Sequence, residues 1–478
     1  MPEHTSKSII KSIGWVSIGN IATLLSGMIS LIVIARILDP ADFGLYITAI
    51  LVIALPGTVS STLANALIQK SEISEREIKT VNGVSVALSM IFCAALFVLA
   101  PTISDALGQN QLVMIVRVCA FFMIFDAITS VSAGLLTRNM EFKKISAVDI
   151  ISGLISVTCG ITFAILLENA WALVIMEGTR RFLRMVLFST FAKWLPSVAF
   201  DMAALKRVAL FGTHMTLLKL LVQVQDVVTG LIVGRVNGPA GLGLYNLANR
   251  LLQQATQTLI WPASVVAFPL LAKAKPGSPN FRQSLSECIS LVTLISFPAF
   301  AGAFVVVPEL IPILFGEKWS GAIVATQIAL ALGVFRSIAT VNESVLSSVG
   351  KPERLVFINC ATLAWIIIGL TLFAKNGLEA VMLVMLAREA LLFALGVWQI
   401  DRAVGIQVMD QLRPAMLPLF AASGMFVAIF ALNSFAIVSW PAIAAIGITI
   451  FTGILSYAAC LYLVAPATVR RVLAMVKK

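Results

Sequence analysis

The sequence predicts an all-α polytopic membrane protein of about 14 transmembrane helices, arranged as two parallel-repeat six-helix bundles plus two C-terminal helices. Hydrophobic residues make up 59% of the 478 residues and charged residues only 12%, whereas soluble domains carry about 25% charged residues. Apolar runs of roughly 20 residues, each long enough to cross a hydrocarbon core, recur along the chain. In addition, the stretch at 35–46 is echoed at 234–245, which indicates an internal duplication.

The individual helices follow from these apolar runs and from the short polar turns between them. Long runs without a ten-residue alternation favour helices over a transmembrane β-barrel. The connectors are short, so no soluble domain fits between the helices. We predict helices at roughly 12–34, 43–68, 81–103, 112–136, 146–167, 170–191, 208–233, 242–272, 284–307, 320–349, 355–374, 377–399, 411–432 and 437–465.

The lysines and arginines in the connectors are distributed unequally between the two sides of the membrane. Of the 34 lysines and arginines, 22 lie on the side of the N-terminus and 4 on the other side. The positive-inside rule therefore predicts that both termini are cytoplasmic. The net charge of +11 reflects this topology, and we expect no nucleic-acid partner. The N-terminal run is interpreted as a retained first helix rather than a cleaved signal peptide.

The duplication is clearest in ARILDPADFGLY (35–46) and GRVNGPAGLGLY (234–245), which match at an offset of 199. A second echo joins FDAITSVSAGLL (125–136) to FRSIATVNESVL (335–346). Six helices separate each stretch from its echo, so both copies cross in the same direction and the repeat is parallel. We predict a substrate path where the two bundles meet. The predicted parts are a bundle at 1–191, a cytoplasmic linker at 192–207, a second bundle at 208–399, two additional helices within 411–465 and a basic cytoplasmic tail at 466–478.

The two echoed corners are interpreted as structural hinges on the extracytoplasmic side. Proline suits the first turn of the following helix, and Gly44 and Gly243 allow a close approach of the backbone. In the first copy, Asp39 and Asp42 can cap a helix start.

Eight basic residues fall inside predicted spans, where each costs roughly 2.5–3.5 kcal/mol at a helix centre. On several helices they form one polar stripe, which favours a shared water-filled cavity. The alternative is a set of structural ion pairs such as Glu177–Arg181, and Arg117 and Arg184 lie toward span ends where they can reach the interface. The candidate substrate contacts are Arg117, Arg180, Arg181, Arg184, Lys219, Arg250, Arg336 and Arg388.

The acids inside the spans do not balance these bases. Six acids against eight bases leave the interior positive, and guanidinium groups suit phosphate or pyrophosphate by bidentate bonding. The sequence therefore predicts an anionic passenger. Candidate coupling acids, for Na⁺ or H⁺, are Asp126, Glu177, Asp226 and Glu343.

Cofactor chemistry and catalysis are not indicated. The six cysteines lie in apolar runs without a CxxC or Cys/His pairing, so we predict no metal site and no cofactor. A membrane glycan ligase or polymerase would need a large extracytoplasmic loop with catalytic side chains, and the connectors are too short for one. We therefore predict a protein that is not an enzyme.

Three motifs carry a family resemblance: the ARxLxPxDFGLY corner, ANALIQK after the second span and RNMEFKK before the fifth. With the fourteen spans, they resemble bacterial polysaccharide transporters of the Wzx/ExoT-like type, in the multidrug/oligosaccharidyl-lipid/polysaccharide exporter superfamily. The resemblance implies a flippase in the bacterial cytoplasmic (inner) membrane. It would move undecaprenyl-pyrophosphate-linked oligosaccharide to the periplasmic leaflet for exopolysaccharide, capsule or O-antigen assembly. It also implies alternating access, ion-gradient coupling, and a polysaccharide polymerase and chain-length regulator as partners.

Two alternatives in the same superfamily stay open. A peptidoglycan-precursor flippase shares the fold, the charge logic and the lipid carrier. A multidrug cation antiporter often binds its coupling cation near an acid in the first helix, but GWVSIGNIATLLSGMISLIVIA has none. A cavity for cationic drugs should also be acidic, whereas this one counts basic.

Overall fold

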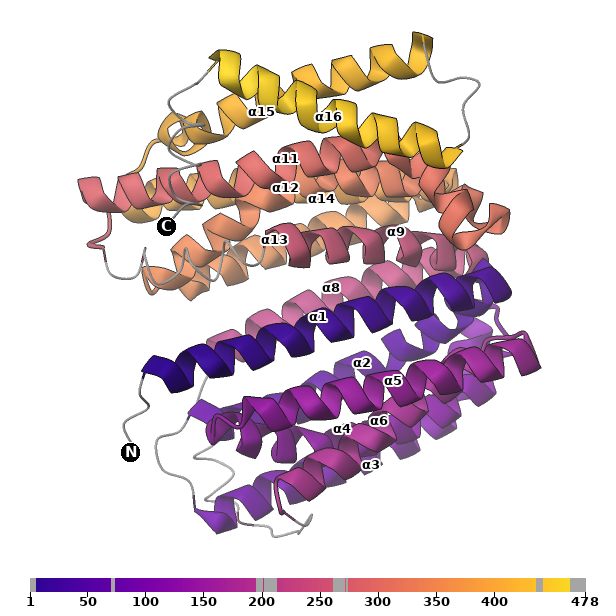
Figure 1. The fold of residues 1–478 in the computed structure, drawn as a ribbon. Helices are drawn as coiled ribbons and strands as arrows, with labels where there is room; N and C mark the ends of the chain where they lie inside the picture. Colours follow the sequence, from indigo (N-terminus) through magenta and orange to yellow (C-terminus); the bar gives the residue numbers. More distant parts are fainter. Residues whose placement is uncertain are drawn as a thin grey trace. The chain divides into compact units, whose positions relative to one another are not determined.

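A computed structural model describes residues 6–69, 74–194, 201, 213–260, 271, 274–435 and 442–464 (Figure 1). The regular elements of this described part are fourteen α-helices and two short 3-10 helices, in agreement with the predicted all-α class. The chain divides into two compact units, residues 1–243 and 244–478. The predicted linker at 192–207 falls mostly, and the predicted tail at 466–478 entirely, outside the described residues.

The first unit is built around α4, which packs against α2, α3 and α6, while α5 packs on α1 and α6 and α8 packs on α2. Its core holds fully buried side chains of α4 such as Val116, Cys119 and Met123. The helices are α1 (Ser6–Ile37), α2 (Pro40–Gln69), α3 (Glu75–Leu107), α4 (Leu112–Arg138), α5 (Phe142–Leu167), α6 (Trp171–Phe191), α8 (Thr213–Val236) and the start of α9 (Gly238–Leu259).

The second unit places α12 between α11 and α14, with α13 on α14 and with α15 and α16 on α11. Three packed pairs of the first unit therefore recur here, because α3/α4, α4/α6 and α5/α6 correspond to α11/α12, α12/α14 and α13/α14. The elements are α11 (Pro279–Phe315), η1 (Glu317–Ala322), α12 (Ile323–Ser348), α13 (Pro352–Phe373), η2 (Ala374–Asn376), α14 (Leu378–Val404), α15 (Val408–Phe435) and α16 (Ala442–Val464).

Eleven helices of the described part are long and apolar enough to cross a membrane, so the chain is a multi-pass membrane protein. Neither α6 nor α9 is among these eleven. Their sequences explain this, because α6 carries four charged residues and α9 carries Arg250 among several glutamines and asparagines. These two helices combine one apolar face with one polar face, which is the pattern of a helix that meets water or polar partners on one side.

Helix ends follow local capping. α3 begins at Glu75, earlier than predicted, because Ser74 and Glu77 form a capping box at its N-terminus. It ends at Leu107 and is capped by Gly108, which adopts a left-handed conformation with φ of 68°. α11 extends past the predicted end at 307 to Phe315 and carries Pro298, Pro308 and Pro312 inside it. α9 ends at Leu259, so the described helix is shorter than the predicted 242–272, and residues 261–270 lie outside the described part.

The echoed corners contact each other reciprocally. The Cα of Gly44 lies so close to Pro239 that an added Cβ would overlap the Pro239 carbonyl, and Gly243 has the same relation to Pro40. The predicted close approach of the backbone is therefore confirmed. Asp42 contacts the start of α6 as well as its own helix start. Its carboxylate accepts hydrogen bonds from the N–H of Asp39 at 3.3 Å and from the N–H of Ala170, just before α6, at 3.0 Å.

Gly44 should not tolerate a side chain. We expect Gly44→Ala to lower the free energy of unfolding by about 1–3 kcal/mol, because the new Cβ meets backbone rather than a movable side chain. Gly57→Ala, in the same helix, is the control, since a Cβ at Gly57 meets nothing within 4 Å. Thermal unfolding of the detergent-solubilised protein measures both. Equal melting temperatures for the two variants would contradict the proposed packing.

Candidate functional site

The first charge cluster consists of Asp126 on α4 with Glu177 and Arg181 on α6. Glu177 and Arg181 are four residues apart, so both project from one face of α6. The Arg181 Nε donates to Glu177 Oε1 at 2.7 Å, and its Nη1 donates to Asp126 Oδ2. The Arg181 guanidinium also lies over the Phe122 ring, 5.8 Å from its centroid. One guanidinium thus joins two carboxylates and an aromatic face, with 18% of the Arg181 side chain exposed.

A second contact of α6 ties it to α5. Arg184, one turn beyond Arg181, donates from Nη1 to Asp149 Oδ1 at 2.6 Å. Its guanidinium lies 5.3 Å from the ring centroid of the buried Phe188. Charged side chains in a membrane interior are stabilised by such partners, because the partners offset part of the cost of removing the charges from water. The charges of α6 therefore hold α4, α5 and α6 together.

The second charge cluster consists of Arg336 on α12 with Arg388 and Glu389 on α14. Glu389 is 5% exposed. Its Oε1 accepts from Arg336 Nη1 at 2.7 Å and from Arg388 Nη1. The arrangement inverts the first cluster, because here one carboxylate lies between two guanidiniums.

The two clusters occupy equivalent places in the two repeats. Asp126 and Arg336 each follow the phenylalanine that opens the second echo, at an offset of 210. At the same offset, Ser132 corresponds to Asn342. The Ser132 hydroxyl lies 3.4 Å from that of Ser189 on α6, and a Cβ on Gly396 of α14 would lie 3.1 Å from Asn342 Nδ2.

These equivalent contacts, α4 to α6 and α12 to α14, align α6 with α14 in sequence. Ser189 and Gly396 differ by 207, and the same offset pairs Arg181 with Arg388. Both repeats therefore keep an arginine at this position of α6 and α14. On α4 and α12 the aspartate of the first repeat is replaced by an arginine in the second, and Glu389 supplies the balancing carboxylate.

The remaining predicted substrate contacts lie in different surroundings. Arg180, Lys219 and Arg250 are exposed, and the described residues contain no ion pair to Arg180 or Lys219. Arg117 donates from Nε to the Phe97 carbonyl at 3.2 Å and stacks on the Phe97 ring, so it serves the α3–α4 contact.

The predicted coupling acids also separate into two groups. Asp126 and Glu177 both bind Arg181, whereas Asp226 on α8 and Glu343 on α12 are exposed. Asp149 and Glu389 were not among the predicted site residues. Their role depends on which helices are neighbours, and only the swap of Asp126 for Arg336 between the echoes hinted at it. No group of three or more His, Cys, Asp or Glu side chains that could hold a metal occurs in the part of the chain that the structure describes.

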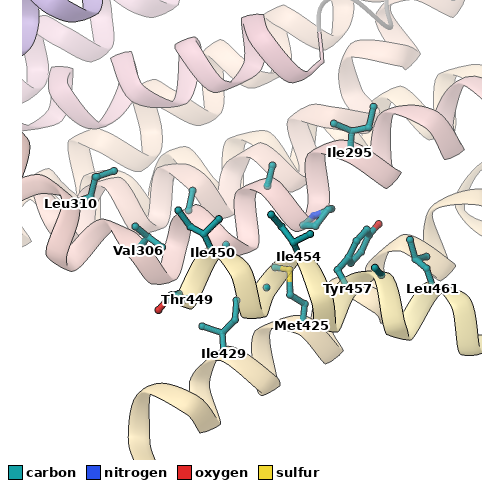
Figure 2. A pocket seen from close by; sticks show the side chains of 16 residues that line it. Ile295, Val306, Leu310, Met425, Ile429, Thr449, Ile450, Ile454, Tyr457 and Leu461 are labelled. Atoms are coloured by element: carbon teal, nitrogen blue, oxygen red, sulfur yellow. The ribbon is translucent and has the colours of Figure 1, made fainter. Parts of the chain in front are cut away.

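An apolar groove of about 650 Å³ lies between α11, α15 and α16 (Figure 2). Gly302 and Gly453 line it without a side chain that would fill it, and Ile295, Ile450 and Ile454 also line it. The hydroxyl of Tyr457 donates to the Leu294 carbonyl at 2.8 Å. The groove therefore offers almost entirely hydrocarbon surface.

Comparisons with known proteins agree with the resemblance read from the motifs. The model of a family described as "Polysaccharide biosynthesis protein" matches residues 33–324, more than half of the chain. The chain is 27% identical to the lipopolysaccharide biosynthesis protein WzxC of Escherichia coli K12, over 71% of this chain and 70% of that protein. It is 24% identical to the teichuronic acid biosynthesis protein TuaB of Bacillus subtilis 168, over 77% of each.

A solved structure shares the fold. The structure titled lipid II flippase MurJ, in an inward closed conformation, superimposes with a TM-score of 0.72 at 15% identity. The match covers 95% of this chain and 99% of that one. The predicted fold class is thus confirmed.

Proposed function

The chain belongs to the polysaccharide biosynthesis protein family, and we propose that it is a flippase for undecaprenyl-pyrophosphate-linked oligosaccharides. It moves them from the cytoplasmic to the periplasmic leaflet for exopolysaccharide, capsule or O-antigen assembly. Relatives whose names assign them to lipopolysaccharide and teichuronic acid biosynthesis support this proposal. The transporter-like fold supports translocation rather than catalysis.

The observation that carries the proposal is the exposure of Arg180, Lys219 and Arg250 within helices of a membrane protein. Arginine and lysine in a membrane interior face water, a partner or a ligand rather than lipid. A pyrophosphate offers several anionic oxygens, and guanidinium binds such oxygens through paired, charge-assisted hydrogen bonds. We therefore propose Arg180 and Lys219 in the first unit, and Arg250 in the second, each as a contact to the pyrophosphate or to the sugars.

The proposed cycle is alternating access driven by an ion gradient. Asp226 and Glu343 are the better coupling candidates, because their carboxylate side chains are exposed. A Na⁺ ion or a proton would neutralise an exposed carboxylate and change its preference for water. Cytoplasmic termini, and a polymerase and chain-length regulator that receive the flipped glycan, belong to the same proposal.

The apolar groove is the proposed place for part of the polyprenyl chain. Its walls are hydrocarbon along α11, α15 and α16, so a chain of isoprene units buries apolar surface there. Such burial contributes about 25 cal/mol per Å². Cationic side chains for the pyrophosphate and an apolar groove for the polyprenyl tail match the two chemical parts of a lipid-linked glycan.

Filling the groove should reduce export. We expect Gly302→Leu to lower export about 10-fold or more, because the added side chain extends into the groove. The new Cβ itself lies in ordinary contact, 3.8 Å from Met425 Cε. Gly447→Leu on α16 is the matched control, since nothing lies within 4 Å of a Cβ at Gly447. Surface glycan is quantified at equal membrane levels of both variants. Full export by Gly302→Leu would remove the groove from the proposal.

Deletion of the gene tests the proposed function as a whole. We expect loss of one surface polysaccharide and accumulation of its undecaprenyl-pyrophosphate-linked repeat unit on the cytoplasmic side, identified by mass spectrometry of extracted lipids. Accumulation of a peptidoglycan precursor would instead identify the alternative flippase. Unchanged glycans with increased sensitivity to cationic drugs would identify an antiporter.

A further inference from the structure

A polar pocket of about 480 Å³ lies in the second unit and shares no residue with the two charge clusters. It is formed where α11 begins and where the turn after α14 leads into α15. Its lining combines two guanidiniums, one carboxylate and two neutral polar groups with apolar side chains. The lining residues are Arg282, Gln283, Leu285, Ser286, Ile406, Asp410, Arg413 and Pro414.

The pocket is positive and partly preorganised. Arg282 donates from Nη2 to the Gly405 carbonyl at 3.1 Å, which holds its guanidinium at the pocket wall. Gly405 can aim its carbonyl there because it ends α14 in a left-handed conformation with φ of 69°. Arg413 has no ion pair within the described residues. Two arginines against Asp410 leave one net positive charge, which a single anionic group would neutralise.

The surface next to the pocket is apolar along one face of α15. Met409, Arg413, Met416 and Phe420 follow one another at intervals of four, three and four residues, so they share one face of α15. The side chains of Met409, Met416 and Phe420 are 62%, 57% and 64% exposed. A guanidinium at one end of an exposed apolar stripe is the pattern that suits an amphiphile with an anionic head.

We propose that this pocket binds the phosphodiester headgroup of an anionic phospholipid, with the acyl chains along the α15 stripe. The phosphate accepts hydrogen bonds from Arg282 and Arg413, and the Ser286 hydroxyl adds a neutral donor. The positive-inside distribution assigns this end of the helices to the cytoplasmic leaflet. The pocket shares no residue with the proposed glycan contacts, so its occupancy does not depend on the proposed transport function.

Native mass spectrometry of the full chain in detergent, with added phosphatidylglycerol or phosphatidylcholine, tests the proposal. We expect wild type to retain phosphatidylglycerol preferentially. Arg282→Gln/Arg413→Gln should bind it about 10-fold more weakly, because charge-assisted hydrogen bonds are lost. Asp410→Asn should bind it more tightly, since it removes the carboxylate that competes with the phosphate.

Arg402→Gln is the control for net charge, because this exposed arginine lies over the Trp398 ring, 4.2 Å from its centroid, outside the pocket. Equal retention by wild type and the double variant would overturn the proposal, and so would equal loss in Arg402→Gln. Soluble glycerol 3-phosphate separates the two sources of phosphate. If millimolar glycerol 3-phosphate displaces the lipid, the site takes a free phosphate and the lipid assignment is wrong.

Discussion

Replacing Arg180, Lys219 and Arg250 together by glutamine is expected to abolish glycan export while the protein stays in the membrane. Hydrogen bonds to charged groups contribute roughly 1.5–3 kcal/mol each, so each single variant should reduce export about 10-fold or more. Arg336 is left out of this set because its guanidinium binds Glu389 at 2.7 Å. Its removal would disturb the α12–α14 contact as well as any contact to substrate.

A matched control distinguishes the effect of where the charges lie from the effect of removing three positive charges. Lys193, Lys275 and Lys318 are exposed residues in turns or in the short η1, and their joint replacement by glutamine removes the same three charges. We expect this control to export normally. Quantified surface polysaccharide, lipid-linked glycan in membrane extracts and immunoblots of membranes provide the readouts. Normal export by the Arg180/Lys219/Arg250 variant at wild-type protein levels would rule out the proposed head contacts.

The helices and corners could be predicted because they depend on local sequence. Each of the fourteen apolar runs appears as a helix in the described residues, since a backbone in lipid must satisfy its hydrogen bonds internally. Gly44 and Gly243 also kept their predicted role, because the echo places glycine where a Cβ would overlap backbone. Errors at helix ends came from features outside the apolar pattern, such as the capping box at Ser74.

The charge pairing could be predicted only where it is local. The Glu177–Arg181 pair follows from a spacing of four residues on one helix. The partners of Arg184 and Arg336 come from other helices, so they depend on helix rotation and neighbourhood, which periodicity does not define. The excess of eight bases over six acids within the predicted spans does not show which bases are paired with carboxylates and which can bind a substrate. Four of those eight bases bind carboxylates. Arg180, Lys219 and Arg250 are the stronger candidates because their side chains are exposed.

The exchange of charges between the repeats has a structural explanation. A charge buried between two packed helices needs a partner of opposite sign, but either helix can supply the acid. In the first unit Asp126 and Glu177 surround Arg181, and in the second unit Arg336 and Arg388 surround Glu389. Duplicated helices can therefore diverge to opposite polarity while their packing register is retained.

Removing only the carboxylate of the second charge cluster should affect stability differently from replacing all three of its charged residues. We expect Glu389→Leu to destabilise the protein by about 3–5 kcal/mol, because Arg336 and Arg388 lose the buried carboxylate that they share. The triple variant Arg336→Met/Arg388→Met/Glu389→Leu should unfold near the wild-type temperature, since apolar side chains of similar volume avoid the cost of burying charge.

Thermal unfolding in detergent measures the stabilities, and export assays on the same variants show whether the cluster does more than hold α12 to α14. Arg402→Met serves as the control for replacing an exposed arginine of α14. If Glu389→Leu unfolds at the same temperature as wild type, the cluster does not stabilise the α12–α14 contact. A triple variant that is stable but exports poorly would show that these charges also act in transport. A stable triple variant with full export would confine them to packing, because stability and transport would then depend on different arginines.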